Sequence, residues 1–190
     1  YGNEYTDFTA GNFQRTGRSL DLAIEGNGFF EVLTPNGVRL TRAGNLTLDA
    51  QGQLVTPDGF LVLGQGAATQ DPKTRALRLT GTQVSVGEDG TIFSDPQAGG
   101  AAVGRLSLVS IENTKLLKKE GGNLFVYEET QPAGNNLERL PASAPLRAPK
   151  VHQGILEKSN VNPVKTMNDL MQAHRMYEQN LKLMQTVGDM

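Results

Sequence analysis

Residues 159–190 carry the strongest helical pattern in the sequence. Asn162 is suited to cap a helix start, and Pro163 suits the first helical position, where its missing N–H costs nothing. No further proline follows, and the next glycine is Gly188. Large side chains recur at steps of three and four residues, which is the heptad spacing of a helix-pairing face. This face, called the seam, consists of Met167, Leu170, Met171, His174, Tyr177, Leu181 and Met184, and Val187 extends it.

The seam has to be covered, because each large apolar side chain left in water forgoes about 1.5–3 kcal/mol. One interpretation is that the helix lies on its own domain, as amphipathic helices commonly do. The other is that it pairs with another helix. Because the sequence contains no second helical pattern of similar length, that helix would come from another molecule or from a segment outside this sequence. We interpret His174, which lies within the seam, as a packing or partner-contacting residue rather than a metal ligand.

The remainder of the sequence has the pattern of a turn-rich β protein, and the whole chain contains 22 glycines and no tryptophan. Asn36-Gly37 tolerates positive φ and predicts a hairpin within residues 29–41. A second hairpin is predicted within residues 46–55, and residues 105–111 predict one longer strand that is partly buried on both faces. We therefore predict a mainly β fold, with a short-stranded β domain of hairpins and meanders and one long C-terminal α-helix.

The predicted organisation has three parts. Residues 1–19 form an extended connecting segment, residues 20–150 form the β domain, and residues 151–190 form a connecting strand and the C-terminal coiled-coil helix. Prolines are concentrated between residues 130 and 150, which marks extended chain at the end of the β domain. Tyr1 is not a methionine, so we expect the natural chain to begin upstream.

Composition argues against several functional classes. A net charge of −2 gives no electrostatic case for nucleic-acid binding. The chain has no cysteine and two distant histidines, so we expect no metal site and no cofactor. No apolar run reaches the length of a membrane span, and no secretory leader opens the sequence. We therefore expect no membrane insertion.

Catalytic residues are also not predicted. Glu25, Glu31 and Asp49 could form the carboxylate pair of a glycosidase, but carboxylates in short strands usually occupy the solvent face. The sequence has no Gly-x-Ser-x-Gly nucleophile elbow. We therefore predict that the protein is not an enzyme.

Two separate motifs resemble a known family. The first runs from Leu20 to Phe30 and continues through residues 40–46 and 49–55, and the second runs from Gly154 to Val164. Both are similar to signatures of the bacterial flagellar rod and hook proteins, whereas residues 65–149 resemble that family only loosely. The residues that carry the resemblance are Gly26, Gly28, Phe29, Phe30, Arg42, Gly44, Asn45, Ser159, Asn160, Val161 and Asn162.

The resemblance implies a structural subunit of the flagellar basal-body rod. Members of the family are exported through the flagellar type III apparatus without a cleaved leader and polymerise helically into a hollow rod across the periplasm. Their terminal helices form an inner coiled-coil layer and their β domains an outer layer. The implied partners are other copies of the chain and other rod and hook axial proteins. The family's N-terminal helix is absent from this sequence.

Within the family, residues 7–11 and 183–187 resemble the proximal rod protein more than the distal one. The β domain is too small for a full hook protein, which usually carries a further outer domain, so a hook-type axial protein is kept only as the alternative. An alternative from a different class is a carbohydrate-binding or wall-lytic β module. A compact cleft that holds two carboxylates with displaced pKa values would favour that class.

Overall fold

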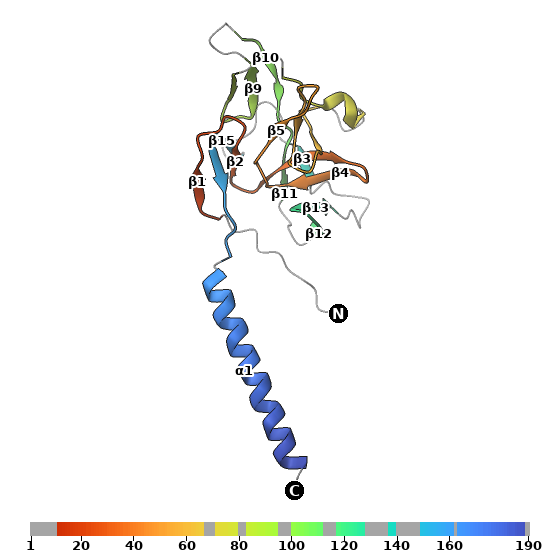
Figure 1. Cartoon of the computed structure of the whole chain (residues 1–190). Coiled ribbons are helices and arrows are strands. Elements are labelled where there is room, and N and C mark those ends of the chain that lie inside the picture. The colour runs from red at the N-terminus through yellow and green to blue at the C-terminus, as the bar shows by residue number, and fades with distance from the viewer. Residues whose placement is uncertain are drawn as a thin grey trace. The chain divides into compact units, whose positions relative to one another are not determined.

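The computed structural model of the chain is mainly β with one long C-terminal α-helix, which confirms the predicted fold class (Figure 1). It describes residues 11–66, 71–79, 83–94, 100–111, 117–127, 137–139, 149–161 and 163–188. The chain separates into two compact units. The first, called the β unit, ends at Lys158, and the second begins at Ser159.

The largest sheet is built around the hairpin of β3 (Gly28–Thr34) and β4 (Gly37–Thr41). Thr34 pairs with Gly37, whose φ of 105° is accessible to glycine without strain. The hairpin predicted from Asn36-Gly37 is therefore confirmed. The strand order is β12-β13-β4-β3-β7-β6-β5, and β11 pairs with both β3 and β14. The other strands are β5 (Thr47–Leu48), β6 (Leu54–Val55), β7 (Leu61–Val62), β11 (Leu108–Ile111), β12 (Leu117–Gly121), β13 (Leu124–Tyr127) and β14 (Leu137–Arg139).

Strands β5 and β6 form the second predicted hairpin, which is likewise confirmed. Asp49 Oδ1 accepts hydrogen bonds from the backbone N–H groups of Gln51 at 2.9 Å and Gln53 at 2.7 Å. Such bonds are the way in which an aspartate stabilises a turn. Asp49 is therefore a turn residue.

A separate three-stranded sheet has the order β10-β9-β8. The prediction of one strand over residues 105–111 is wrong, because β10 ends at Arg105 and pairs with β9, whereas β11 begins at Leu108 and pairs with β3. Leu106 and Ser107 carry the chain from one sheet to the other. The elements of this region are the 3-10 helix η1 (Pro72–Arg75) and the strands β8 (Val84–Val86), β9 (Thr91–Ser94) and β10 (Ala102–Arg105).

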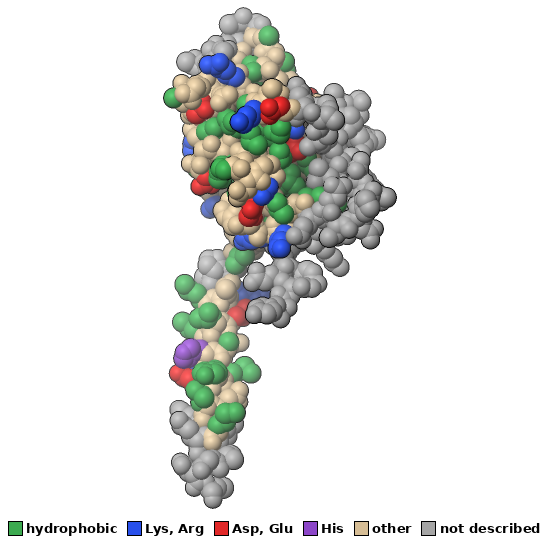
Figure 2. All heavy atoms as spheres, turned by 90° about the vertical axis from the view of Figure 1, so that its right-hand side faces the viewer, with side chains coloured by type: hydrophobic (Ala, Val, Ile, Leu, Met, Phe, Trp, Pro, Cys, Tyr) green, Lys and Arg blue, Asp and Glu red, His purple; other side chains and the backbone are tan. Residues whose placement is uncertain are grey.

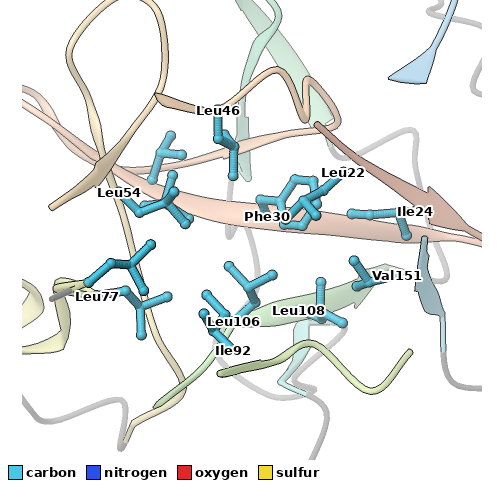
Figure 3. Close-up of a cluster of buried hydrophobic side chains, with 13 residues drawn as sticks. Leu22, Ile24, Phe30, Leu46, Leu54, Leu77, Ile92, Leu106, Leu108 and Val151 are labelled. Atoms are coloured by element: carbon cyan, nitrogen blue, oxygen red, sulfur yellow. The ribbon is translucent and has the colours of Figure 1, made fainter. Parts of the chain in front are cut away.

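Strand β3 is buried on both faces, because successive residues of a strand point to opposite sides. Phe30 and Val32 belong to the larger apolar cluster, which fills the space between the sheets (Figure 3). Phe29 belongs to a second cluster. The larger cluster consists of Leu22, Ile24, Phe30, Val32, Leu46, Leu54, Val62, Leu77, Leu79, Ile92, Leu106, Leu108 and Val151.

Residues from the two ends of the β unit pair with each other. Strand β2 (Leu22–Glu25) pairs with β15 (Lys150–Gln153), and β1 (Phe13–Arg15) pairs with β16 (Ile155–Glu157). The backbone N–H of Lys158 donates to the carbonyl oxygen of Asn12 at 2.9 Å. The chain entering the β unit and the chain leaving it therefore run side by side in an antiparallel ribbon, called the β1–β16 ribbon.

The second unit consists chiefly of α1 (Pro163–Gly188), a helix of 26 residues. The predicted helix that begins at Pro163 is confirmed. Asn162, the predicted cap, lies outside the described residues.

Candidate interaction surfaces

The side chains of the seam are exposed along α1. The exposed fraction is lowest at Leu181, with 41%, and highest at Met184, with 74%. Positions three and four apart on a helix share one face, so these side chains form a continuous stripe. Figure 2 shows hydrophobic side chains distributed along this helix. The seam residues are Met167, Leu170, Met171, His174, Tyr177, Leu181 and Met184.

An exposed apolar stripe of this length is typical of a protein–protein contact. His174 lies within it and places Nδ1 3.4 Å from Glu178 Oε1, one helical turn further along. In the described part of the chain no three His, Asp or Glu side chains gather as metal ligands. The described part also contains no helix long and apolar enough to cross a membrane.

Sequence reasoning did not single out Met176, which is 64% exposed. It lies on α1 but outside the seam, because 100° of rotation per residue places it half a turn from Met167. Val187, which was expected to extend the seam, lies where the structure describes no side chain.

A second constellation ties the β1–β16 ribbon to the rest of the β unit. Arg42 follows β4 and binds Glu157 of β16, with 3.1 Å between Nη2 and Oε2. The same guanidinium donates to the carbonyl oxygens of Gly26 at 3.0 Å and Gly28 at 3.4 Å. It also lies over the Phe29 ring, 5.7 Å from the centroid. We call Arg42, Glu157 and these two carbonyl groups the Arg42 latch.

Glu157 joins a third segment to the latch. Its Oε1 accepts a hydrogen bond at 3.0 Å from the backbone N–H of Gly11. The side chains of Arg42 and Glu157 are only 14% and 12% exposed. The latch therefore fixes the two chain segments that border the β unit. Glu157 was not among the predicted site residues, although it lies within the second motif.

The motif glycines permit close backbone approach. A Cβ at Gly44 would lie 1.6 Å from the carbonyl oxygen of Leu22, whose N–H donates to Gly44 O at 2.8 Å. A Cβ at Gly28 would lie 2.7 Å from Cβ of Pro149. Only glycine therefore fits these two positions.

The other motif residues have separate places. Phe30 is in the larger cluster. Asn45 is exposed, and its backbone forms an isolated antiparallel β-bridge with that of Asp21. Ser159, Asn160 and Val161 are exposed, whereas Asn162 lies outside the described residues. The structure thus gathers Gly26, Gly28, Phe29 and Arg42 of the first motif at the latch, together with Glu157 of the second.

The three carboxylates considered for catalysis have different partners. Glu31 is 1% exposed, so its predicted place on the solvent face is wrong. It is paired with Arg75, and Ser107 donates to its Oε2 at 2.6 Å. Glu25 contacts His152, with 2.6 Å between Oε2 and Nε2. Asp49 closes its turn.

Hydrogen bonds at the surface displace several pKa values. The hydrogen bonds lower the pKa values of three carboxyl groups, in the pairs Glu88 with Lys150, Asp89 with Thr91, and Glu120 with Arg39. The lowered pKa values keep these carboxylates ionised, whereas a general acid requires a raised one. The shifts therefore reflect local pairing.

A β unit with a buried apolar core, a latched terminal ribbon and a helix with an exposed apolar seam are features of a structural protein that assembles through its surfaces. Family models support this class. The model of the "Flagellar hook protein FlgE/F/G D1 domain" matches residues 23–94, and that of the "Flagellar basal body rod FlgEFG protein C-terminal" matches residues 152–190.

Curated relatives match nearly the whole chain. It is 36% identical over 186 residues to the flagellar basal-body rod protein FlgF of Caulobacter vibrioides, covering 97% of this chain and 67% of that protein. It is 35% identical to FlgG of Buchnera aphidicola from Acyrthosiphon pisum, covering 96% and 66%. It is 33% identical to FlgF of Escherichia coli K12, covering 96% and 70%. The chain therefore belongs to the flagellar basal-body rod protein family.

The predicted identity as a structural protein of the flagellar basal-body rod is thus confirmed, as is its location there. Membership of the family supports assembly with other rod and hook axial proteins. The chain spans about two thirds of the length of the relatives given above.

Proposed function

We propose that this chain is a non-enzymatic subunit of the rod that polymerises helically through the seam and the flanks of the β unit. The observation that carries the proposal is the seam, with its heptad spacing and its 41–74% exposed apolar side chains. Contacts between unlike faces of neighbouring copies generate an open helix rather than a closed ring. Such an assembly requires surfaces, not a reactive cleft.

The geometry of the β1–β16 ribbon favours a helix of a rod protein as the partner of the seam. Asn12 and Lys158 are joined by a backbone hydrogen bond, and α1 begins five residues after Lys158. A segment that preceded the β unit would therefore enter it beside the chain that leads to α1. A helix in that segment, from the same subunit or a neighbouring one, is the partner that fits the seam.

The proposal also covers the type of rod protein, its self-association, its location and its export. We assign the chain to the proximal rod type, with the distal type as the alternative, and expect self-association, periplasmic location and passage through the type III export apparatus. FlgF and FlgG relatives match at 36% and 35% identity, so both types have support.

The test replaces two seam leucines together, Leu170→Asp and Leu181→Asp. In a strain that lacks its own copy, we expect the variant to be absent from isolated basal bodies, because charge would be placed in the helix contact. Met176→Asp is the matched control, since Met176 is 64% exposed on α1, close to the 69% of Leu170, but lies off the seam, and it should be incorporated normally.

Thermal unfolding of the purified variants, followed by circular dichroism, separates assembly from folding. The seam variant should keep the unfolding midpoint of the β unit. Normal incorporation of the double variant would refute the seam as an assembly surface. A lowered midpoint of the β unit would instead mean that these leucines serve the fold of the single subunit.

A further inference from the structure

All five methionines of the chain lie between Met167 and Met190. The four that the structure describes are highly exposed, with exposed fractions from 57% at Met171 to 74% at Met184. Met167, Met171 and Met184 belong to the seam, and Met176 lies off it. The chain has no cysteine, so these thioethers are the sulfur groups it offers to an oxidant.

Exposed thioethers react with peroxides. The sulfur lone pair attacks one oxygen of hydrogen peroxide, an S–O bond forms, and the O–O bond breaks. The second oxygen leaves as water after proton transfer. The sulfur is oxidised by two electrons, the peroxide is reduced, and the product is methionine sulfoxide. Exposure to solvent governs which methionines react.

The sulfoxide changes what the seam can bind. A thioether is flexible and apolar and fills gaps in a helix contact, whereas a sulfoxide carries a polar oxygen. Burying that oxygen between helices without a hydrogen-bond donor is unfavourable. Oxidation at the seam therefore opposes pairing, while oxidation of Met176 leaves the pairing face apolar.

We propose that the seam is a methionine oxidation site, at which peroxide modifies Met167, Met171 and Met184 of an unpaired subunit and so prevents helix pairing. The oxidation itself depends only on exposure. Its effect on pairing rests on the proposed function. Once a seam is covered by a partner helix, its methionines are shielded, and Met176 is the one of the four described methionines that stays reactive.

The first experiment treats the purified full chain with hydrogen peroxide and localises each added oxygen, about 16 Da, by peptide mass spectrometry. We expect Met167, Met171, Met176 and Met184 to react within about threefold of one another, because their exposed fractions are similar. Seam methionines that stay unmodified while Met176 reacts would overturn the proposal.

The second experiment measures incorporation into basal bodies with glutamine, which imitates the polarity of the sulfoxide. Met171→Gln with Met184→Gln should reduce incorporation about tenfold or more, since two polar groups enter the seam. Met171→Leu with Met184→Leu should retain it within about twofold, because leucine conserves volume and apolarity. Met176→Gln is the control and should incorporate normally.

The two proposals fail in different ways. If the leucine-to-aspartate variant of the seam is excluded while the double glutamine variant incorporates normally, the inference about oxidation is overturned and the proposed function stands. If both variants incorporate normally, the seam is no assembly surface and both proposals fall. If the variant with Met171→Leu and Met184→Leu failed to incorporate into basal bodies, the inference would also be overturned, because its seam side chains remain apolar.

Discussion

Replacing Arg42 by alanine removes the centre of the latch without touching α1. Arg42 makes six hydrogen bonds, three with the carboxylate of Glu157 and three with backbone carbonyl oxygens. The carboxylate would keep only its bond from the N–H of Gly11. We therefore expect Arg42→Ala to destabilise the β unit and to loosen its terminal ribbon in particular.

The magnitude follows from burial and from the bonds lost. Removing one partner of a fully buried ion pair costs about 3–5 kcal/mol, and a hydrogen bond to a charged group contributes about 1.5–3 kcal/mol. The six bonds share one guanidinium, so they do not add. Arg42 and Glu157 remain 14% and 12% exposed, and water can replace part of the interaction. The expected loss is about 2–4 kcal/mol of unfolding free energy.

Urea unfolding followed by circular dichroism measures this loss, and amide hydrogen exchange locates it. Exchange should accelerate in residues 11–16 and 154–158 and stay unchanged in residues 84–94. Arg42→Lys keeps the charge but not the fork that binds a carboxylate at two points, so its loss should be intermediate. A double-mutant cycle with Glu157→Gln isolates the coupling between the two side chains.

A loss below about 0.5 kcal/mol, the range of ordinary surface substitutions, would refute the latch. Unchanged exchange in the ribbon would show that its backbone pairing holds without Arg42. Equal losses for the lysine and alanine variants would show that two-point binding contributes nothing.

Three further predictions concern the β unit. Arg75→Met should cost about 3–5 kcal/mol in urea unfolding because it strands the buried Glu31 carboxylate, and adding Glu31→Leu in the same chain should recover most of that loss. Gly44→Ala should lower the free energy of unfolding by about 1–3 kcal/mol or more, because the added Cβ would collide with the carbonyl oxygen of Leu22. A thermal midpoint equal to that of the wild type would contradict this. The pKa of Asp89 is lowered on folding, so this carboxylate adds a small stabilisation of the folded state at pH values above its ordinary pKa of 3.8. The stabilisation is lost as the pH falls through the lowered pKa of the folded state. Asp89→Asn should therefore reduce the decline of the thermal midpoint in acid.

Local patterns in the sequence were sufficient to predict α1 and the two hairpins. Asn36-Gly37 determines its turn through backbone preferences that do not depend on the rest of the fold, and Asp49 does so through hydrogen bonds within four residues. The heptad spacing of α1 likewise repeats within one helix. Such features are predictable because their partners are near in sequence.

The burial of Glu31 was not predictable in this way. Its partner Arg75 is 44 residues further along the chain, and a carboxylate in a short strand carries no local sign of an ion pair. Arg42 and Glu157 are 115 residues apart. The resemblance indicated that Arg42 and Gly44 matter, but only the tertiary structure shows the physical reasons, a shared carboxylate and a backbone carbonyl within touching distance.

The β1–β16 ribbon also sets the order in which the chain can fold. The bond from Gly11 to Glu157 closes a loop of 146 residues, whereas the β3–β4 hairpin closes within a few. Closing the long loop costs more entropy, so we expect local hairpins to form first and the ribbon last. A chain delivered N-terminus first stays open until residues 150–157 follow, since β1 and β2 lack their partners before then. The segment that completes the β unit is thus the one that arrives immediately before α1.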